Sequence, residues 1–432
     1  MSRLPAPVPE ERSDWRIVRP AKILVLHNRY QQAGGEDGVY AHEVQLLRRN
    51  GHQVIEYLEN NEGLDETNAF RSGLAAIWSC DTTARLRKVL HQERPDIAHF
   101  HNTFARISPA AYYACRQAGV PVVKTLHNFR IGCLNAFCMT EGNLCERCLP
   151  HLIPVAGIVK GCYRGSSVTS AGMAAITITH KILGTYRKQV DAYIALTEFA
   201  RRVHLRAGVP ADKTFVKPNF IDHRAEPASD RQRYALFASR LCPEKGVLTM
   251  LQAWKQNGLD ITLKIAGDGP SAPEVAEAAA QYPNIEWLGS RSQDQVMELM
   301  RHARFLVMPS LGYENFPLCL VEAFSAGLPC LASGHGAMQE IVDDGLTGLH
   351  FQTGDAADLA AKARWMAAHP AECQQMGLAA RERFSERYTP ERNYQILTKI
   401  YDSAMSNFRI SRSCERRPAL TDGFKACSYE DL

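Results

Sequence analysis

Two glutamates eight residues apart, Glu314 and Glu322, have a spacing that suggests chemistry. A short apolar run that ends at Met308 precedes them, and Gly327 follows them. This pattern places Glu314 in a loop after a strand and Glu322 about one turn inside the next helix. A carboxylate in the second position can accept hydrogen bonds from both hydroxyls of a ribose, and one in the first position can hold the hydroxyls of a sugar.

The helix start between the two glutamates is suited to an anion. Pro317 fits the first turn of a helix, where its missing N–H is harmless. The free backbone N–H groups near Phe316, Leu318 and Cys319 then point out of the helix, and the helix dipole favours a diphosphate there. The alternative is structural: Glu322 is an ordinary helix acid and Glu314 a solvated loop residue. The spacing alone does not decide between them.

A cysteine-rich segment lies further towards the N-terminus. Cys145 and Cys148 form a C-x2-C pair, Cys133 and Cys162 flank it at similar distances, and Cys138 competes with Cys133 for one position. The N-terminus has no apolar secretion signal, so we expect a reducing compartment in which clustered cysteines are metal ligands before disulfides. Cys133, Cys145, Cys148 and Cys162 are therefore candidate ligands of a structural zinc ion. The alternative is reduced cysteines that pack a long loop.

Glycines and histidines mark other strand ends. Gly34 and Gly35 follow the first apolar run and allow a ligand close to the backbone, although a simple strand-to-helix turn would also explain them. The pattern is not Gly-x-Gly-x-x-Gly, so the dinucleotide fingerprint of a dehydrogenase is absent. His99 and His101 end another apolar run. We expect one of them in a cleft and the other as a structural histidine.

Apolar runs and amphipathic stretches alternate along the 432 residues, interrupted by a hinge predicted at Pro218–Asp222. Before the hinge, strands are expected at Lys22–His27, Gln53–Tyr57, Asp96–Phe100, Val120–Leu126, Asp191–Leu196 and Thr214–Val216. After it, strands are expected at Tyr234–Ala238, Thr262–Ala266, Ile285–Leu288, Phe305–Met308, Cys330–Ala332 and Gly348–Phe351. Short apolar strands alternating with helices predict parallel sheets covered on both faces. The expected fold is α/β, with two doubly wound domains and ligands in the cleft between them.

The composition limits the classes of partner. The net charge of +4 is too small to suggest nucleic acid, and no run of about 18 apolar residues predicts a membrane-spanning helix. Cys80, Cys319 and Cys330 stand singly among apolar residues, which predicts small core side chains.

Several segments together resemble family 4 glycosyltransferases of the GT-B fold, which has two Rossmann-like domains. The donor site of that family is resembled by residues 314–322, 326–329 and 340–348, and its phosphate-binding Arg/Lys pair by residues 239–246. The segments 266–270 and 218–219 fit as well, and the similarity runs from Ala21 to Tyr401. The resemblance implies a retaining glycosyltransferase, of the kind acting in bacterial surface-polysaccharide assembly. Such an enzyme moves a hexosyl-type sugar from a nucleotide-diphosphate sugar to a glycan or lipid-linked acceptor.

The resemblance assigns Arg240 and Lys245 to the diphosphate. Fixed cations and helix N–H groups stabilise the charge of the leaving group more in the transition state than in the ground state, so no catalytic cofactor is expected. His127 occupies the position of the family's active-site histidine, and front-face displacement is expected because no glycosidase-type carboxylate pair is identifiable. The candidate catalytic residues are His127, Arg240, Lys245 and Glu314. The candidate donor-binding residues are Gly34, Gly35, Gly267, Asn315, Phe316, Pro317, Leu318 and Glu322.

The expected division is a disordered arm at 1–20, an acceptor-side domain at 21–217 with a cysteine-rich insertion at 130–165, and a donor domain at 218–389. A helix at 390–407 packs back on the first domain, and a disordered tail follows at 408–432. The basic, partly apolar stretch Ala171–Val190 can touch an anionic membrane, although packing on its own sheet is favoured. We expect a cytoplasmic protein, at the inner face of the cell membrane if that contact forms. A nucleotide-sugar 2-epimerase of the same fold, or a non-catalytic sugar- or nucleotide-binding scaffold, remains the alternative function.

Overall fold

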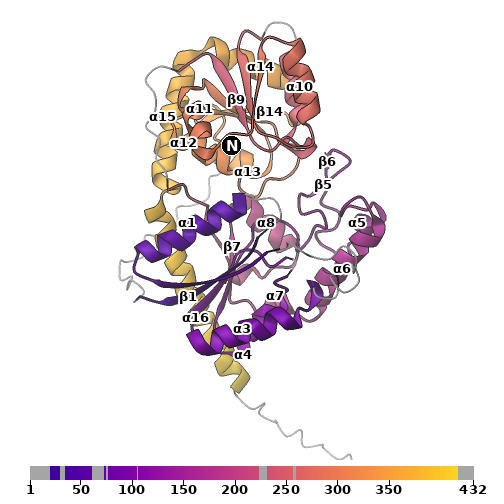
Figure 1. The fold of residues 1–432 in the computed structure, drawn as a ribbon, viewed down its shortest axis with the longest axis vertical. Coiled ribbons are helices and arrows are strands. Elements are labelled where there is room, and N and C mark those ends of the chain that lie inside the picture. The colour runs from indigo at the N-terminus through magenta and orange to yellow at the C-terminus, as the bar shows by residue number, and fades with distance from the viewer. Residues whose placement is uncertain are drawn as a thin grey trace, which may run out of the picture.

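Two parallel sheets of six strands, each with helices on both faces, make up the protein (Figure 1). The structure, a computed structural model, describes residues 20–29, 35–60, 73, 76–104, 106–222, 231–255 and 259–416. Most of the predicted N-terminal arm, the predicted donor-site residue Gly34, and residues 417–432 lie outside the described residues. The predicted fold class of two doubly wound α/β domains is confirmed.

The N-terminal sheet has the order β2-β1-β3-β4-β7-β8. Its strands are β1 (Lys22–Arg29), β2 (Gln53–Asn60), β3 (Ile97–Phe100), β4 (Val122–Thr125), β7 (Ala192–Ala195) and β8 (Thr214–Val216). Its main helices are α1 (Gly35–Arg49), α3 (Cys80–Glu93), α4 (Ala110–Gln117) and α8 (Glu198–Arg206). The prediction that Cys80 belongs to a core is wrong: it is exposed, because it is the first residue of α3, which buries Leu86 and Leu90 instead.

Between β4 and β7 the chain forms an insertion at the side of the N-terminal domain (Figure 1). Its elements are β5 (Met139–Thr140), β6 (Asn143–Leu144), α5 (Val155–Val159), α6 (Ser167–Ile182) and α7 (Thr185–Lys188). Gly184, with φ of +66°, separates α6 from α7 and so divides the basic stretch 171–190 into two helices.

The C-terminal sheet has the order β11-β10-β9-β12-β13-β14. Its strands are β9 (Tyr234–Ala238), β10 (Thr262–Ala266), β11 (Ile285–Gly289), β12 (Phe305–Met308), β13 (Cys330–Ser333) and β14 (Gly348–Phe351). Its helices are α9 (Val247–Lys255), α10 (Ala272–Gln281), α11 (Gln293–His302), α12 (Leu318–Ser325), α13 (Gly336–Ile341), α14 (Ala356–Ala368) and α15 (Pro370–Arg387). Of the other single cysteines, Cys330 is fully buried and Cys319 is half-buried.

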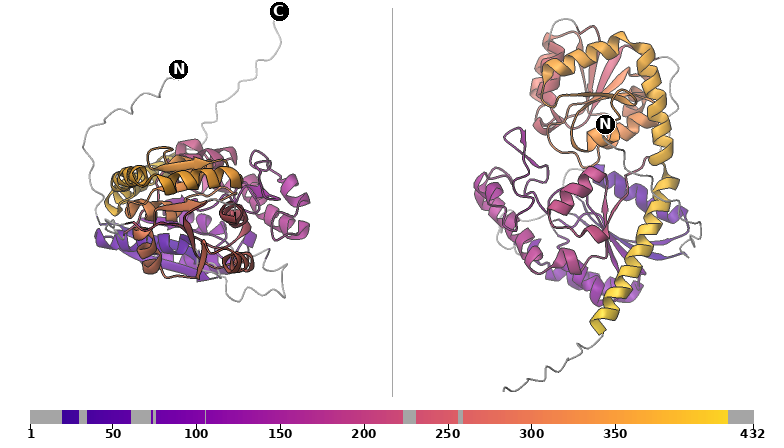
Figure 2. Two further views of the ribbon diagram at one scale, coloured as in Figure 1. Left: turned by 90° about the horizontal axis from the view of Figure 1, so that it is seen from above. Right: turned by 180° about the vertical axis from the view of Figure 1, so that it is seen from behind.

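The last helix, α16 (Pro390–Arg416), returns along the N-terminal domain (Figure 2). It continues beyond residue 407, where a tail was predicted, because residues past that point still make contacts. Phe408 is buried within 5.4 Å of the Arg116 guanidinium, and Arg116 donates to the Ser411 hydroxyl at 2.6 Å. No helix among the described residues has the length and apolar character that crossing a bilayer requires.

The chain crosses between the domains twice, and the two crossings lie side by side. The first crossing follows β8, and the second joins α15 to α16. The Asn393 side chain of α16 donates to Pro218 O at 2.6 Å, and Ile221 N donates to Tyr388 O at 3.2 Å. The predicted hinge is therefore bonded to the second crossing.

Candidate functional site

The loop between β12 and α12 holds Glu314 against a lysine from the loop after β9. Lys245 Nζ lies 2.6 Å from Glu314 Oε1, and the Ser310 hydroxyl donates to the same oxygen at 2.8 Å. The side chains of Lys245 and Glu314 are 22% and 18% exposed. Burial opposes the charge of Lys245, but the Glu314 carboxylate outweighs it and raises the Lys245 pKa. Lys245 is therefore a fixed cation at this edge of the sheet.

Glycines bring the loops at the carboxyl ends of the strands into close contact. Gly246 has φ of +71°, and a Cβ there would lie 1.9 Å from Pro309 O. At Gly267, with φ of +156°, a Cβ would lie 2.0 Å from Ser239 O. Neither position accepts another residue without backbone movement. Arg240, next to this contact, has an exposed side chain.

Glu322 lies one turn inside α12, as predicted, and is half-buried. Burial raises the pKa of its carboxyl, and a hydrogen bond from the Gln293 side chain partly offsets this. Pro317 was predicted in the first helical turn but precedes the helix, with ψ of 99°, because its fixed φ and missing N–H also suit the extended residue before a helix. Arg240, Lys245, Glu314 and Glu322 are called the C-terminal polar cluster below.

The N-terminal domain meets this cluster at several points. A Cβ on Gly35, the first residue of α1, would lie 3.4 Å from the Leu318 side chain at the start of α12. The Asn315 side chain donates to Leu126 O at 2.5 Å, while its own Oδ1 is buried with no partner among the described residues. Phe316 packs on Tyr388 at the end of α15, with ring centroids 6.0 Å apart. Three of the predicted donor-binding residues, Gly35, Asn315 and Leu318, thus lie where the two domains touch.

A chain of buried polar groups leads to His127, which follows Leu126. His127 Nε2 lies 3.1 Å from His101 Nδ1, and His101 Nε2 lies 3.0 Å from Glu43 Oε1. The other carboxylate oxygen of Glu43 accepts from Lys217 Nζ at 2.7 Å, and His99 Nδ1 lies 3.1 Å from Glu43 Oε1. Glu43, His99, His101 and Lys217 are called the N-terminal polar cluster below, and all four are at most 1% exposed.

Burial fixes the charge states in this region. It lowers the pKa of His101 to about 3 and that of His127 well below its ordinary value, with further lowering of the His127 pKa by His101 and Lys124. Burial alone would raise the pKa of Glu43, but Lys217 and the histidines outweigh it and hold that pKa well below its ordinary value. His127 is therefore a neutral imidazole that can donate or accept a hydrogen bond.

A cavity of about 80 Å³ opens beside His127 and is called the histidine cavity below. Its polar lining includes Lys124, Asn128 and Arg130, and its apolar lining includes Phe104 and side chains of α6. Arg130 lies with its guanidinium 4.7 Å from the Phe104 ring centroid, and its Nε and Nη1 are buried with no hydrogen-bond partner in the described part of the chain. The lining contains two basic side chains and no carboxylate, so the cavity is suited to an electron-rich or anionic group.

Two family models match the chain: Glycosyltransferase Family 4 over residues 34–225 and Glycosyl transferases group 1 over residues 219–383. The chain belongs to the family 4, group 1 glycosyltransferases. An uncharacterized glycosyltransferase of Methanocaldococcus jannaschii is 30% identical over 171 residues, 39% of this chain and 48% of that protein. The N-acetyl-alpha-D-glucosaminyl L-malate synthase of Bacillus anthracis is 24% identical over 325 residues, 74% of this chain and 77% of that protein. The family 4 chain thus spans about half the length of the archaeal relative.

Solved structures agree on the fold of this family 4 chain. HepE of Anabaena, in complex with UDP, superposes with a TM-score of 0.65 at 17% identity, over 88% of this chain and 100% of that one. Sucrose-phosphate synthase of Thermosynechococcus elongatus gives a TM-score of 0.64 at 17% identity, over 89% and 99%. The predicted GT-B fold is confirmed.

The sequence analysis missed three charged residues near His127: Glu36, Lys124 and Arg130. Lys124 Nζ donates to His101 O at 2.8 Å, and burial lowers its pKa to about 7. Burial raises the pKa of Glu36 to about 7, partly offset by Lys124. A lysine inside the apolar run 122–126 was the available signal, because a charge within a buried strand requires a partner or a function.

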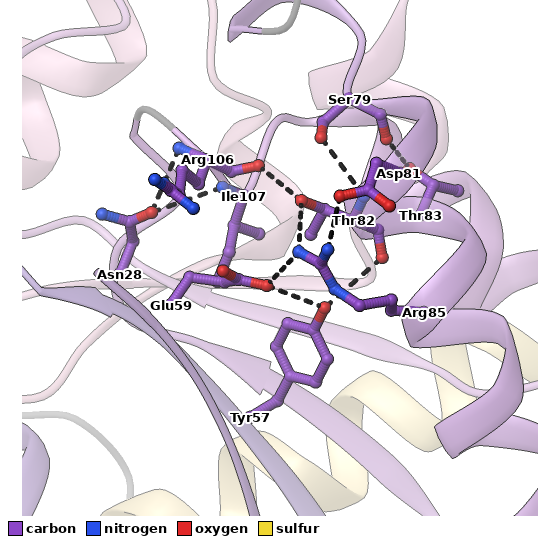
Figure 3. A network of polar contacts seen from close by, with 10 residues as sticks. All are labelled: Asn28, Tyr57, Glu59, Ser79, Asp81, Thr82, Thr83, Arg85, Arg106 and Ile107. Atoms are coloured by element: carbon purple, nitrogen blue, oxygen red, sulfur yellow. Dashed lines mark hydrogen bonds and ion pairs between the residues drawn. The ribbon is translucent and has the colours of Figure 1, made fainter. Parts of the chain in front are cut away.

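A second polar network supports the end of β1 in the family 4 chain (Figure 3). The Asn28 side-chain oxygen accepts from Arg106 N at 3.1 Å, and Arg106 O accepts from the Thr82 hydroxyl at 3.0 Å. Arg85 donates to Glu59 at 2.6 Å and also pairs with Asp81. These bonds connect β1, β2 and α3, and so fix the carboxyl end of β1.

Proposed function

We propose that this chain is a retaining glycosyltransferase that moves a hexosyl-type sugar from a nucleotide-diphosphate sugar to a glycan or lipid-linked acceptor. The observation that carries the proposal is the Lys245–Glu314 ion pair of 2.6 Å beside the start of α12, with Glu322 one turn behind it. The cation and the free N–H groups at the start of α12 suit the diphosphate of a nucleotide sugar. The two carboxylates suit the hydroxyls of its ribose and its sugar.

In the proposed donor complex, Arg240 and Lys245 hold the diphosphate. Glu322 accepts from the ribose hydroxyls and Glu314 from those of the sugar. Gly35 and Gly267 allow the donor close to the backbone, and Asn315 to Leu318 provide the helix start. The fixed charge of Lys245 stabilises the leaving diphosphate without a catalytic metal. Because Anabaena HepE was solved with UDP and with UDP-glucose, UDP-sugars are the first donors to test.

The histidine cavity is the proposed acceptor site, and its presence favours a transferase over an epimerase, which needs no acceptor. In front-face displacement, the bond from the anomeric carbon to the phosphate oxygen breaks. The acceptor oxygen forms its bond on the same face, and its proton passes to the departing phosphate oxygen. Neutral His127 holds a sugar hydroxyl by a hydrogen bond during this step.

Contact with an anionic membrane surface, at the inner face of the cell membrane, is proposed for the insertion. Within the stretch 171–190, Ile182 and Leu183 are 68% and 47% exposed, with Lys181 beside them. Apolar side chains flanked by lysines suit an interface with anionic lipids. Cosedimentation with vesicles that contain anionic lipid should therefore exceed that with neutral vesicles, and equal binding to both would contradict the contact.

The deciding experiment compares Glu322→Gln with Glu277→Gln, an exposed acid of α10 that serves as the matched control. Nucleotide sugars are screened for binding by calorimetry, and products formed with a lipid-linked acceptor are analysed by NMR. We expect the wild type and the control to transfer the sugar with retained configuration after dialysis without divalent ions, and Glu322→Gln to lose transfer while remaining folded. Unchanged transfer in Glu322→Gln, or an inverted product, would overturn the proposal.

A further inference from the structure

Four cysteines from three separate turns of the insertion line one small cavity, called the cysteine cavity below. It measures about 20 Å³, room for one water-sized body, and its lining includes Cys133, Cys145, Cys148 and Cys162. The rest of the lining is apolar except for Lys160. Cys138 is not part of this lining, but its thiol hydrogen-bonds with that of Cys133, and both side chains pack in the neighbouring hydrophobic cluster around Phe129. Among the described residues of the lining, the four thiols are the groups suited to zinc, because Met139 offers a thioether and Lys160 a cation.

The backbone is arranged to bring these thiols together. Cys145 N donates to Cys138 O at 2.8 Å, and Cys162 N donates to Gly157 O at 2.9 Å. A Cβ on Gly157 would lie 3.2 Å from Cys148 Sγ, so the glycine lets α5 approach the C-x2-C turn. Cys138, with φ of +51°, holds the left-handed conformation that residues other than glycine rarely adopt. Such strain persists only where the surroundings fix it.

The insertion has a small core, in which Leu149 packs on α8 and Leu134 packs on α6. Between residues 133 and 162 its regular elements are two strands of two residues and one helix of five. Several of its large apolar side chains are exposed: Phe137, Leu144, Leu152, Ile153, Val155 and Val159. A segment that buries so little apolar surface needs a covalent or metal cross-link to keep one conformation.

We propose that Cys133, Cys145, Cys148 and Cys162 bind a structural zinc ion in the cysteine cavity. Zinc binding forms four Zn–S bonds and releases four thiol protons to solvent, with no change in oxidation state. The resulting site carries two net negative charges. Lys181 is close enough to Cys148 to interact electrostatically and can offset part of that charge, whereas Lys160 Nζ pairs with Glu141 at 2.7 Å.

Zinc binding draws the sulfurs inward. Tetrahedral coordination at about 2.3 Å places sulfurs roughly 3.8 Å apart. Among the described residues, the one group of three ligands whose atoms all lie within 4.8 Å of one another is Glu43, His99 and His101, so no three of the four cysteine sulfurs are all that close together. The short turns that carry the four cysteines can bring the sulfurs together in this way, and the movement closes the cysteine cavity. The Glu43 group needs no metal, because Lys217 already places a cation 2.7 Å from Glu43.

The proposed zinc site also supports the polar loop that holds Glu314. Tyr313 N donates to Phe137 O at 3.1 Å, and Phe137 lies between two of the cysteine turns. The Tyr313 ring packs on Phe199 of α8, with centroids 4.6 Å apart. Metal binding in the insertion would thus fix the contact between Phe137 of the insertion and Tyr313 of the C-terminal domain.

The test is metal analysis of the tag-free full-length protein by mass spectrometry. We expect about one zinc ion per chain, and zinc-edge X-ray absorption should show four sulfur ligands at about 2.3 Å. Cys148→Ser and Cys162→Ser should lose the ion, whereas the control Cys80→Ser, at an exposed cysteine of α3 outside the insertion, should keep it. The absorption spectrum needs no variant, so it decides the question even if a substitution prevents folding.

Three results would overturn the zinc site: a metal content no higher than the buffer blank, disulfides among these cysteines in peptide mapping, or bound iron in place of zinc. None of them bears on the proposed sugar transfer, which the Glu322→Gln comparison tests separately.

Discussion

The two polar clusters contain similar residue types in opposite surroundings. In the N-terminal polar cluster, Glu43 and Lys217 are each about 1% exposed, and their partners are other protein groups. In the C-terminal polar cluster, Lys245 is 22% exposed and Arg240 lies at the surface. A buried, satisfied charge pair serves the fold, whereas half-open charges at strand ends remain available to a ligand. We therefore expect substitutions in the first cluster to affect stability and those in the second to affect activity.

The largest effect is expected for Lys217→Met. It leaves Glu43 charged and buried without its cation, which costs about 3–5 kcal/mol of unfolding free energy. Urea unfolding monitored through hydrogen exchange of the N-terminal sheet measures this loss. The double variant Glu43→Gln/Lys217→Met removes both charges and should recover at least half of it. A loss below about 1 kcal/mol in the single variant would contradict the distinction between the clusters.

Lys245→Ala should act on catalysis instead. Loss of a fixed cation beside the leaving diphosphate should reduce kcat by roughly 100- to 1,000-fold, or about 2.7–4 kcal/mol of transition-state free energy. The stability change should be small because the Lys245–Glu314 pair is partly exposed. Lys255→Ala, at the exposed end of α9, is the matched control. Equal kcat values in the two variants would remove Lys245 from the site.

Glu36 and Lys124 predict an unusual pH dependence of stability. The Glu36 pKa is raised from 4.5 to about 7, so the folded state keeps a proton that the unfolded chain has lost, and stability falls as pH rises through this window. The Lys124 pKa is lowered from 10.5 to about 7, so above pH 7 the unfolded chain binds more protons and stability rises again.

Each slope should approach about 1.4 kcal/mol per pH unit. Buried histidines such as His101 and His127 give the opposite slope below about pH 6.5, because their pKa values are lowered. The difference in urea midpoint between the wild type and Glu36→Gln/Lys124→Met isolates the two groups, and it should be least favourable to the wild type near pH 7. A difference between wild type and variant that does not change with pH would show that these two groups do not titrate as their burial implies.

The smallest effect is expected for Arg240→Ala. Its side chain is exposed, so its attraction to the diphosphate is screened, and KM for the donor should rise roughly two- to fivefold. Initial rates at low and high salt measure it, and the difference between wild type and variant should shrink as salt is added. A loss as large as that of Lys245→Ala would mean that Arg240 becomes buried when the donor binds.

The sequence predicted the C-terminal half better than the N-terminal half. Strands β9, β10, β12 and β14 have the predicted bounds, and helix α11 spans Gln293–His302, the range that its apolar periodicity predicts. Apolar periodicity and local end signals specify each of these elements. Ser292 and Gln295, for example, form a reciprocal capping box at the start of α11. Helices α3 and α15 were missed, since few large apolar residues mark their buried faces.

The candidate site shows the same difference: its C-terminal part could be predicted from the sequence better than its N-terminal part. Residues 314–322 form one contiguous motif, so its local geometry could be read from the chain. The groups around His127 come from distant segments: Lys217 is 174 residues from Glu43, and Tyr401, which hydrogen-bonds His99 at 2.8 Å, is 302 residues away. No local pattern records contacts at such separations. The sequence could name His127 but not its surroundings.

The adjacent interdomain crossings have a mechanical consequence. Asn393 bonds both Pro218 O and Lys217 Nζ, so the two connections are held to each other and to the N-terminal polar cluster. Two domains joined at two neighbouring points can rotate about the line through those points, but the second connection resists sliding and twisting of one domain against the other. The domains should therefore open and close along a single path, and Gly35 should return to the same place opposite Leu318 after each cycle.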